Sequence, residues 1–407
     1  MKFTEGGVTA AKGFEAAGAE AQIKYKNRMD MALVYSKVPC VSAGTFTSNV
    51  VKAAPVLWDK NIVDTKETAQ AVVVNSGIAN ACTGKQGMDI CKKEAECAGR
   101  LLGIPADAVL VASTGVIGMQ IPEDRICAGI EKLAAAKTDT LKAGNDAARA
   151  IMTTDTVFKE VAVEIELSGK KVTLGGMCKG SGMIHPNMCT MLGFVTTDAA
   201  ISKELLVKAV KKDVIDSFNM ISVDGDTSTN DTLLVLANGM AKNPVITEEN
   251  EDYKVFCEAL RAVTTTLAKK MAGDGEGATA LFETKVIHAD TKQNARILAK
   301  SVICSSLTKA AIFGHDANWG RILCALGYSG VNFDPENVDL YFEAEGKKMA
   351  IFGKGVACDY SEEEASAILS CKEVTALVDM HMGEESATAW GCDLSYDYVK
   401  INADYRS

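Results

Sequence analysis

The feature that most constrains the fold of this chain is the alternation of short apolar runs with amphipathic stretches. Residues 71–74 (AVVV) predict a buried strand that ends at the turn Asn75-Ser76-Gly77, and residues 108–112 (AVLVA) predict a second strand that runs into Ser113-Thr114-Gly115. Between them, apolar residues at helical spacing predict a helix that ends at Gly103. Strands that alternate with helices indicate a mixed α/β fold.

Signals further along the chain support the same class. Apolar and polar residues alternate over 161–167 ahead of Ser168-Gly169-Lys170, which predicts a hairpin with one solvated face. Ser202 is a predicted N-cap, and Ser361 with Glu364 has the spacing of a capping box. A soft boundary near residues 283–285 predicts a smaller C-terminal α+β domain.

Length, composition and charge exclude several classes of protein. The 407 residues can form more than one domain, and 47% hydrophobic with 24% charged residues is typical of a globular chain. A net charge of -10 argues against nucleic acid or an anionic membrane as a partner. No apolar run approaches the roughly 20 residues that span a bilayer. The first residues lack the apolar core of a signal peptide, so we expect a cytosolic protein.

The sequence predicts neither a metal site nor a cofactor. The thirteen Cys residues are scattered as singles and only four His residues are present, so no zinc-binding spacing exists. The loop with Asp224, Asp226 and Asp231 lacks the ligand spacing of an EF-hand, and its carboxylates are interpreted as turn caps. The segment GDGEGA lacks the third Gly of a dinucleotide fingerprint.

Two possible nucleophiles, Cys189 and Thr190, adjoin each other in KGSGMIHPNMCTML. No His is spaced to act as a relay to either, although a Ser or Cys nucleophile normally needs such a base. A Thr at a chain N-terminus can use its own α-amine instead, which would require cleavage of the chain just before Thr190. The residues alone leave open which of the two reacts.

The motifs of the chain resemble those of one family along nearly the whole length. They are GGVTAAKGF, NSGIANACTGKQG, ASTGVIG, IMTTDT, KGSGMIHPNMCTML, SVDGDTSTND, GDGEGAT, GHDANWGRI and DYVKINADYRS, in this order. Taken together they resemble the glutamate N-acetyltransferase/ornithine acetyltransferase family of the cyclic arginine-biosynthesis route.

The resemblance implies a self-cleaving enzyme. Cleavage between Cys189 and Thr190 would give an α chain (1–189) and a β chain (190–407), and Thr190 would become an N-terminal nucleophile. It would carry acetyl from N2-acetyl-L-ornithine to L-glutamate in a ping-pong reaction, with Thr114 and Gly115 as the oxyanion hole. The family further implies a layered αββα core in which residues 1–189 and 190–284 complete one catalytic domain, Thr190 starts a central strand, and 285–407 form the smaller domain.

The resemblance also implies how small-molecule substrates are bound. The residues that match the family's substrate contacts are Thr153, Lys179, Thr190, Glu276, Asn402 and Ser407. A Lys can pair with an α-carboxylate, and Glu276 can hold a cationic amine. No cofactor is implied, acetyl-CoA is a candidate co-substrate, and the cleaved chains would assemble as an α2β2 heterotetramer.

This chain departs from the usual family pattern at a few positions. Cys189 stands where Ala is usual, and Ser407 stands where Thr is usual and keeps the hydroxyl. The other departures are Ile78, Phe158, His185 and Ala280. The nucleophile and the Ser-Thr-Gly segment are intact.

Two other functions remain as alternatives at this point. An aminopeptidase or amidase on a related self-cleaving scaffold would share the N-terminal nucleophile but release acyl groups to water. A non-catalytic binding protein would keep the chain uncut.

Overall fold

The computed structural model describes residues 1–185 and 191–403, and these form two compact units. The first unit contains Met1–Gly180, Pro186–Asn219 and Thr227–Leu267. The second contains Ser181–His185, Met220–Asp226 and Ala268–Ser407. Cys189, Thr190 and Ser407 lie outside the described residues.

The first unit is built on a sheet that, within the described ranges, has nine strands. Their order is β1-β6-β7-β8-β9-β3-β4-β5, and β2 pairs with β3. The strands are β1 (Lys2–Thr4), β2 (Phe14–Ala19), β3 (Met31–Phe46), β4 (Thr68–Ile78), β5 (Val109–Val116), β6 (Lys159–Leu167), β7 (Lys170–Lys179), β8 (Leu192–Thr197) and β9 (Thr232–Ala237).

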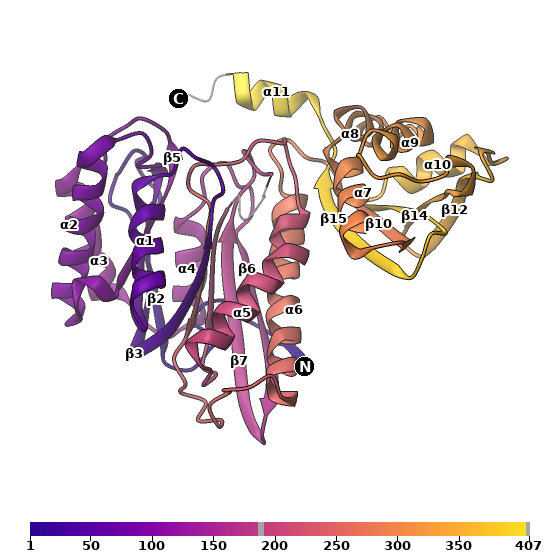
Figure 1. The fold of residues 1–407 in the computed structure, drawn as a ribbon. Coiled ribbons are helices and arrows are strands. Elements are labelled where there is room, and N and C mark those ends of the chain that lie inside the picture. Colours follow the sequence, from indigo (N-terminus) through magenta and orange to yellow (C-terminus); the bar gives the residue numbers. More distant parts are fainter. Residues whose placement is uncertain (186–190, 404–407) are drawn as a thin grey trace. The chain divides into compact units, whose positions relative to one another are not determined.

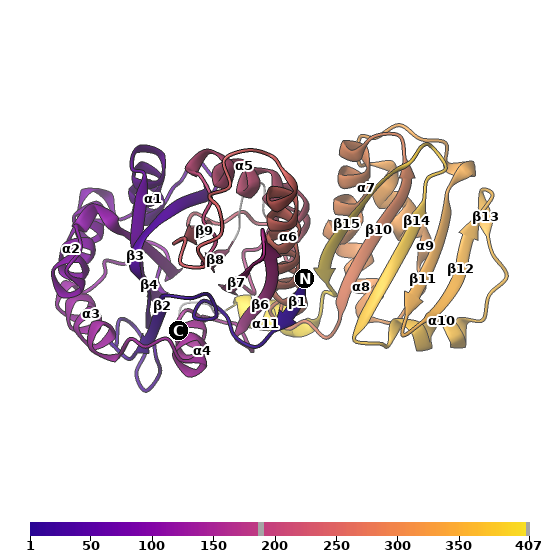
Figure 2. The ribbon, with the colours of Figure 1, turned by 90° about the horizontal axis from the view of Figure 1, so that it is seen from below.

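Helices cover this sheet in layers (Figures 1 and 2). They are α1 (Ala54–Thr65), α2 (Gly84–Leu102), α3 (Glu123–Ala136), α4 (Leu141–Ala150), α5 (Lys203–Asp213) and α6 (Glu251–Gly273). Ala71 and Val73 of β4 pack with α2 and α3, whereas the alternate residues Val72 and Val74 share a core with Phe194 of β8 and other residues of β8 and β9. Alternation along a strand places these sets on opposite faces, so β4 separates two hydrophobic cores.

The mixed α/β class is confirmed, and its two strand layers belong to a single sheet. The long strand β3 joins them, because its first part pairs with β2 and β4 and its last part, from Val41, pairs with β9. The register against β4 shifts between Tyr35 and Cys40, after the pairing with β2 has ended at Ser36 and before the pairing with β9 begins. Strand β8, which begins two residues after Thr190, lies inside the sheet between β7 and β9.

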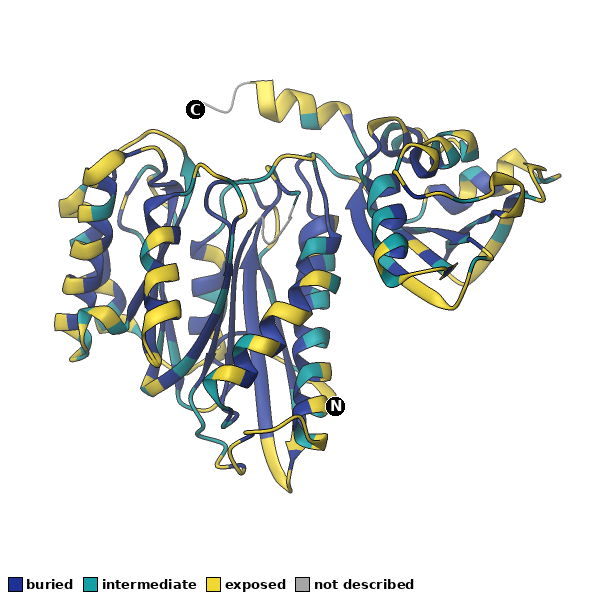
Figure 3. Ribbon diagram, viewed as in Figure 1, coloured by how far each residue is buried: buried dark blue, intermediate teal, exposed yellow. Residues whose placement is uncertain are grey.

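The second unit has a six-stranded sheet in the part of the chain that is described. Its order is β13-β12-β11-β14-β10-β15. The strands are β10 (Leu281–Ala289), β11 (Asp339–Ala344), β12 (Lys347–Gly353), β13 (Val356–Ala357), β14 (Glu373–Asp379) and β15 (Glu385–Cys392). Partly exposed and buried residues alternate along β11, as expected for a sheet with one solvated face. Figure 3 shows both buried and exposed residues on the strands of this unit. The helices are α7 (Lys292–Cys304), α8 (Ser306–Phe313), α9 (Trp319–Gly327), α10 (Glu362–Leu369) and α11 (Tyr396–Ala403).

Several local predictions are confirmed. Gly103 ends α2 in the left-handed region at φ 70°, Ser202 caps α5, and Ser361 accepts a hydrogen bond from the backbone N–H of Glu364.

Two predictions differ from the structure, and a third holds in part. Asn75-Ser76-Gly77 is not a turn: β4 continues through it because its pairing with β5 extends to Gly77 and Ile78. Strands β6 and β7 form the predicted hairpin, and the face of β6 that carries Glu164 and Glu166 is solvated only in part, since α4 packs against this strand. The longest segment of the second unit begins at Ala268, ahead of the soft boundary that we predicted near 283–285. None of the helices among the described residues is long and apolar enough to cross a membrane.

Candidate active site

The predicted oxyanion pair lies at an irregular end of β5. Strand β5 runs parallel to β4, and the register shifts between Gly77, which pairs with Gly115, and Ile78. Gly115 has φ 131°, and a Cβ at this position would lie 2.2 Å from the carbonyl carbon of Gly77. Only glycine fits both this conformation and this approach. Thr114 and Gly115 are therefore still paired with β4, but at a point where the register is irregular.

Asn230, which we did not predict, fixes this strand end. Its side-chain amide donates to the carbonyl of Ser113 at 2.8 Å and to that of Ala79 at 2.6 Å, and the residue is buried. One amide group thus holds the segments after β4 and within β5 together just before Thr114. The residue lies in the motif SVDGDTSTND, but the motif gives no sign of this contact.

Thr153 and Lys179, two predicted substrate contacts, meet in the first unit. Lys179 is the last residue of β7, and its ammonium donates to the Thr153 hydroxyl at 2.8 Å. Asp155 contacts both residues. One of its carboxylate oxygens accepts a hydrogen bond from the Thr153 backbone N–H at 3.0 Å and lies 3.5 Å from the Lys179 Nζ. The other accepts from Lys159 at 2.8 Å and from the Gly180 backbone N–H at 2.7 Å.

This cluster is strongly charged and buried. The side chains of Asp155 and Lys159 are 0% exposed, and that of Lys179 is 8% exposed. Burial by itself would raise the pKa of Asp155, but the ammonium groups of Lys179 and Lys159, with the hydrogen bonds from Lys159 and Gly180, hold it well below its usual range. Asp155 is therefore a carboxylate throughout the physiological pH range.

The arrangement can bind an anion. Lys159 has the shorter contact with Asp155, while Lys179 lies farther from that carboxylate and nearer the surface. An ammonium group has three donors, and Lys179 uses one on the Thr153 hydroxyl. A substrate carboxylate can take the remaining charge-assisted hydrogen bonds.

Glu276 and Asn402, the predicted contacts of the second unit, also meet. The Asn402 side-chain amide donates to Glu276 Oε2 at 2.7 Å, and the Glu276 backbone N–H donates to the Ser181 carbonyl at 2.8 Å. A Cβ on Gly182 would lie 2.4 Å from Glu276 Oε2, so the carboxylate can occupy this position only beside a glycine. A buried carboxylate with a side-chain amide partner is suited to a cationic amine.

The segment that leads to the predicted cleavage site is held by the motif SVDGDTSTND. Asp224 accepts from the backbone N–H groups of Met183 at 2.6 Å and Ile184 at 2.8 Å, and the Val223 N–H donates to the Ile184 carbonyl at 2.7 Å. Asp224 thus acts as a carboxylate that caps backbone N–H groups, as interpreted, whereas Asp231 is buried and is not a solvated turn carboxylate. These bonds fix the chain up to the residue before His185.

His185 is a neutral side chain in this setting. Its Nδ1 lies 3.1 Å from the Ser222 hydroxyl and 3.5 Å from the Cys304 thiol. Burial, together with the nearby Lys300, lowers the pKa of His185 to about 4. It is therefore uncharged at neutral pH.

The predicted site residues thus fall into two described sets. The structure brings Thr153 and Lys179 together in the first unit and Glu276 and Asn402 together in the second. Thr114 and Gly115 are at the end of β5 in the first unit. The predicted nucleophile Thr190, its neighbour Cys189 and the contact Ser407 lie outside the described residues.

Known proteins match the chain over its full length. The model of the ArgJ family matches residues 15–407. An arginine biosynthesis bifunctional protein ArgJ of Symbiobacterium thermophilum is 54% identical, with 100% of both chains covered. ArgJ 1 of Clostridium acetobutylicum is 52% identical over 98% of this chain and 97% of its own. A crystal structure of ArgJ from Bacillus halodurans matches with a TM-score of 0.51 and 46% identity, covering 53% of this chain and 99% of that chain.

The chain belongs to the ArgJ family. It is an acetyltransferase of arginine biosynthesis, and the predicted enzyme class, glutamate N-acetyltransferase/ornithine acetyltransferase, is confirmed.

Proposed function

We propose that the enzyme moves an acetyl group from N2-acetyl-L-ornithine to L-glutamate through an ester on Thr190. The full-length similarity to bifunctional proteins of arginine biosynthesis is the observation that carries this proposal. In the first half-reaction Thr190 Oγ attacks the acetyl carbonyl, and ornithine leaves with the proton of the hydroxyl. In the second, the amine of glutamate attacks the ester, and Thr190 Oγ regains a proton as N-acetylglutamate leaves.

The nucleophile is formed by self-cleavage between Cys189 and Thr190. Thr190 Oγ attacks the Cys189 carbonyl carbon, the peptide C–N bond breaks, and water hydrolyses the resulting ester. The products are a carboxylate on Cys189 and a free α-amine on Thr190, which then serves as the general base. An α-amine has an unperturbed pKa near 8, so a modest downward shift leaves much of it neutral at physiological pH.

Chain length in a relative supports the cleavage. The solved ArgJ chain from Bacillus halodurans is matched over 99% of its length by only 53% of this chain. Residues 190–407, the proposed β chain, likewise make up slightly more than half of the 407 residues. We propose that the two cleaved chains remain associated and pair as α2β2.

The charges described above support the substrate assignment. Lys179, with Thr153 beside it and Asp155 behind it, is proposed to bind the α-carboxylate that ornithine and glutamate share. Glu276 and Asn402 are proposed to bind a substrate amine, with Ser407 as a further contact. The proposed oxyanion donors are at Thr114 and Gly115, and loss of one such donor typically costs about 3 kcal/mol of transition-state stabilisation.

Cleavage is tested by denaturing gel electrophoresis of purified protein. The wild-type chain is expected as two bands of similar size, and Thr190→Ala as a single, inactive band. Cys189→Ala is the matched control, which should still cleave and transfer acetyl. An active protein with a single band would refute the cleavage, and an uncut Cys189→Ala beside a cut Thr190→Ala would make Cys189 the nucleophile. Hydrolysis of peptide amides without acetyl transfer would favour the aminopeptidase alternative.

Acetyl-CoA is proposed as a second acetyl donor, because the relatives are named bifunctional. We expect N-acetylglutamate to form from acetyl-CoA and glutamate when N-acetylornithine is absent, measured by product formation. Activity that requires N-acetylornithine would restrict the enzyme to the transfer reaction.

A further inference from the structure

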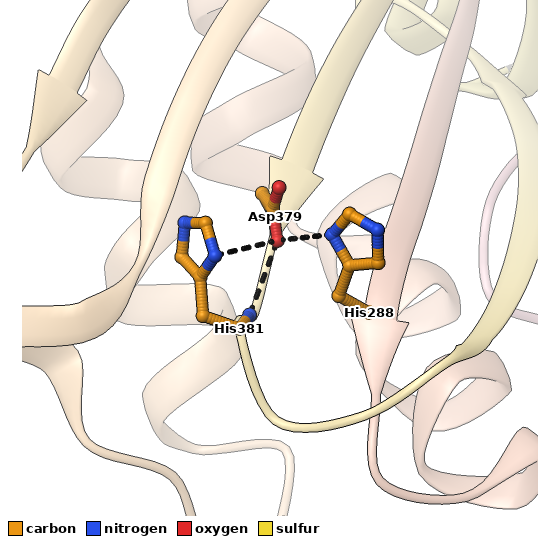
Figure 4. Close-up of side chains that lie close together, drawn as sticks. All are labelled: His288, Asp379 and His381. Atoms are coloured by element: carbon orange, nitrogen blue, oxygen red, sulfur yellow. Dashed lines mark hydrogen bonds and ion pairs between the residues drawn. The ribbon is translucent and has the colours of Figure 1, made fainter.

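Two histidines and an aspartate converge at the ends of β10 and β14 in the second unit (Figure 4). His288 is in β10, Asp379 is the last residue of β14, and His381 follows two residues later. The His288 Nδ1 lies 2.8 Å from Asp379 Oδ1, and the His381 Nδ1 lies 3.4 Å from the same oxygen. One ligand atom from each residue lies within 4.8 Å of the others.

These separations suit a common metal ion. Zinc binds histidine nitrogen and carboxylate oxygen at about 2.0–2.2 Å, so two ligands of one tetrahedral ion lie about 3.3 Å apart. The two nitrogen–oxygen separations, 2.8 and 3.4 Å, lie on either side of this value, and all three ligand atoms lie within 4.8 Å of one another. The side chains of His288 and His381 are 48% and 47% exposed, which leaves room for the rings to rotate and for a water ligand.

A second carboxylate fixes the orientation of one ring. The His381 Nε2 lies 2.8 Å from Asp339 Oδ2, so Nε2 donates to Asp339 and Nδ1 is left facing Asp379. A carboxylate on the far nitrogen of a ligating histidine is the usual way in which proteins set its tautomer and increase its basicity.

The strand register gives an independent reason for a cation. Asp339 of β11 and Asp379 of β14 are direct partners in the antiparallel ladder. Like charges directly opposite each other destabilise a sheet. His381 contacts both carboxylates, and a divalent cation coordinated by Asp379 would offset the remaining repulsion.

The backbone holds the three residues in place. His288 and His381 have φ of 53° and 48°, a conformation that residues other than glycine rarely adopt. The backbone N–H groups of Met382 and Gly383 both donate to the His288 carbonyl, and the His381 N–H donates to Asp379 Oδ1. The turn after β14 is therefore tied to β10 next to the cluster.

We propose that His288, Asp379 and His381 bind a divalent transition metal ion of the zinc type, with Asp339 as the carboxylate that orients His381. Two imidazoles with one carboxylate favour such an ion over Mg²⁺ or Ca²⁺, which prefer oxygen ligands. The ion would link β10 to the end of β14 and to β11. It stabilises the second unit and takes no part in the acetyl transfer proposed above.

Zinc binding by the untagged, full-length, chelator-treated protein tests the site. Isothermal titration calorimetry is expected to show one high-affinity zinc ion per chain. His288→Ala and His381→Ala should each weaken binding by about 100-fold or more, and Asp339→Asn by about 10- to 100-fold. His315→Ala, which alters a histidine outside the cluster, is the matched control and should bind as the wild type does. Circular dichroism confirms that each variant is folded.

Substitution by Co²⁺ separates this site from the cysteines. Co²⁺ bound by nitrogen and oxygen gives ligand-field bands without an intense thiolate charge-transfer band. That result, lost in His288→Ala, supports the proposal. No binding, equal binding by all variants, or a thiolate band would overturn it, and none of these outcomes bears on acetyl transfer.

Discussion

The buried cluster around Asp155 and the exposed cluster around Asp379 use similar groups in opposite surroundings. Asp155 lies between two ammonium groups, and its side chain is 0% exposed. Asp379 contacts two imidazoles at the surface and faces Asp339 across the sheet. In the Asp155 cluster, the ammonium groups of Lys159 and Lys179 contact one carboxylate. In the Asp379 cluster, two carboxylates, Asp379 and Asp339, lie next to each other.

The difference shows how burial decides what a charge cluster can do. In the interior, a carboxylate is tolerable only when permanent cations and hydrogen bonds replace its hydration. Lys159 and Lys179 supply these cations, and we propose that Lys179 also binds an anionic substrate. At the surface, water and salt screen the charges, so the Asp379 cluster can persist without a metal and is completed by a cation from solution.

The largest effect is expected for Asp155→Asn. This change leaves two buried ammonium groups without their carboxylate, and removal of one partner from a buried ion pair typically costs about 3–5 kcal/mol. We expect the free energy of unfolding, measured by chemical denaturation, to fall by about this amount.

Asp139→Asn is the matched control. Asp139 pairs with Lys37 at 3.2 Å, and its side chain is 63% exposed. An exposed pair contributes about 0–1 kcal/mol, so this variant should remain close to wild type. If both variants lose the same free energy of unfolding, burial does not make the Asp155 ion pairs more important for stability than the exposed pair of Asp139.

A smaller effect, mainly on substrate binding, is expected for Lys179→Met. Hydrogen bonds to charged groups contribute about 1.5–3 kcal/mol, so KM for glutamate should rise roughly 10- to 100-fold. Lys159→Met is the comparison, because Lys159 has the shorter contact with Asp155 and is 0% exposed. It should lower stability more than Lys179→Met does and raise KM less. The reverse pattern in steady-state kinetics and denaturation would exchange the proposed roles of the two lysines.

The sequence predicted the elements better than the contacts between them. Helix α2 and the caps at Ser202 and Ser361 follow from local patterns, and these were confirmed. The continuation of β4 through Asn75-Ser76-Gly77 was missed because polar residues that favour turns can also lie in a strand. Here the parallel pairing with β5 keeps them in the strand. The long strand β3 joins two layers through a change of partners, which no local pattern indicates.

The contacts within the Asp155 and Asp379 clusters were likewise harder to predict than the elements that carry them. Thr153 and Lys179 were predicted from family motifs, but Asp155, which holds them together, was not, because its role depends on a fold that joins residues far apart in sequence. Likewise, no metal site was predicted because His288 and Asp379 are 91 residues apart. The parallel pairing of β10 with β14 brings them together.

The smallest effect is expected for Asp339→Asn in the absence of metal. The change removes the repulsion with Asp379 but also the charged partner of His381, and at a half-exposed site both contributions are small. We expect the free energy of unfolding, measured in a chelator, to change by less than about 1 kcal/mol.

Adding zinc should then stabilise the wild type more than Asp339→Asn, since the variant binds the ion less tightly and binding to the folded state adds to stability. Glu343→Gln, on the same strand and paired with Lys348 at 3.2 Å, is the matched control and should gain as much from zinc as the wild type. If Asp339→Asn also gains the full increment, Asp339 does not orient a metal ligand. If it loses several kcal/mol without metal, the surface cluster is as dependent on its charges as the buried one, and the contrast between the two does not hold.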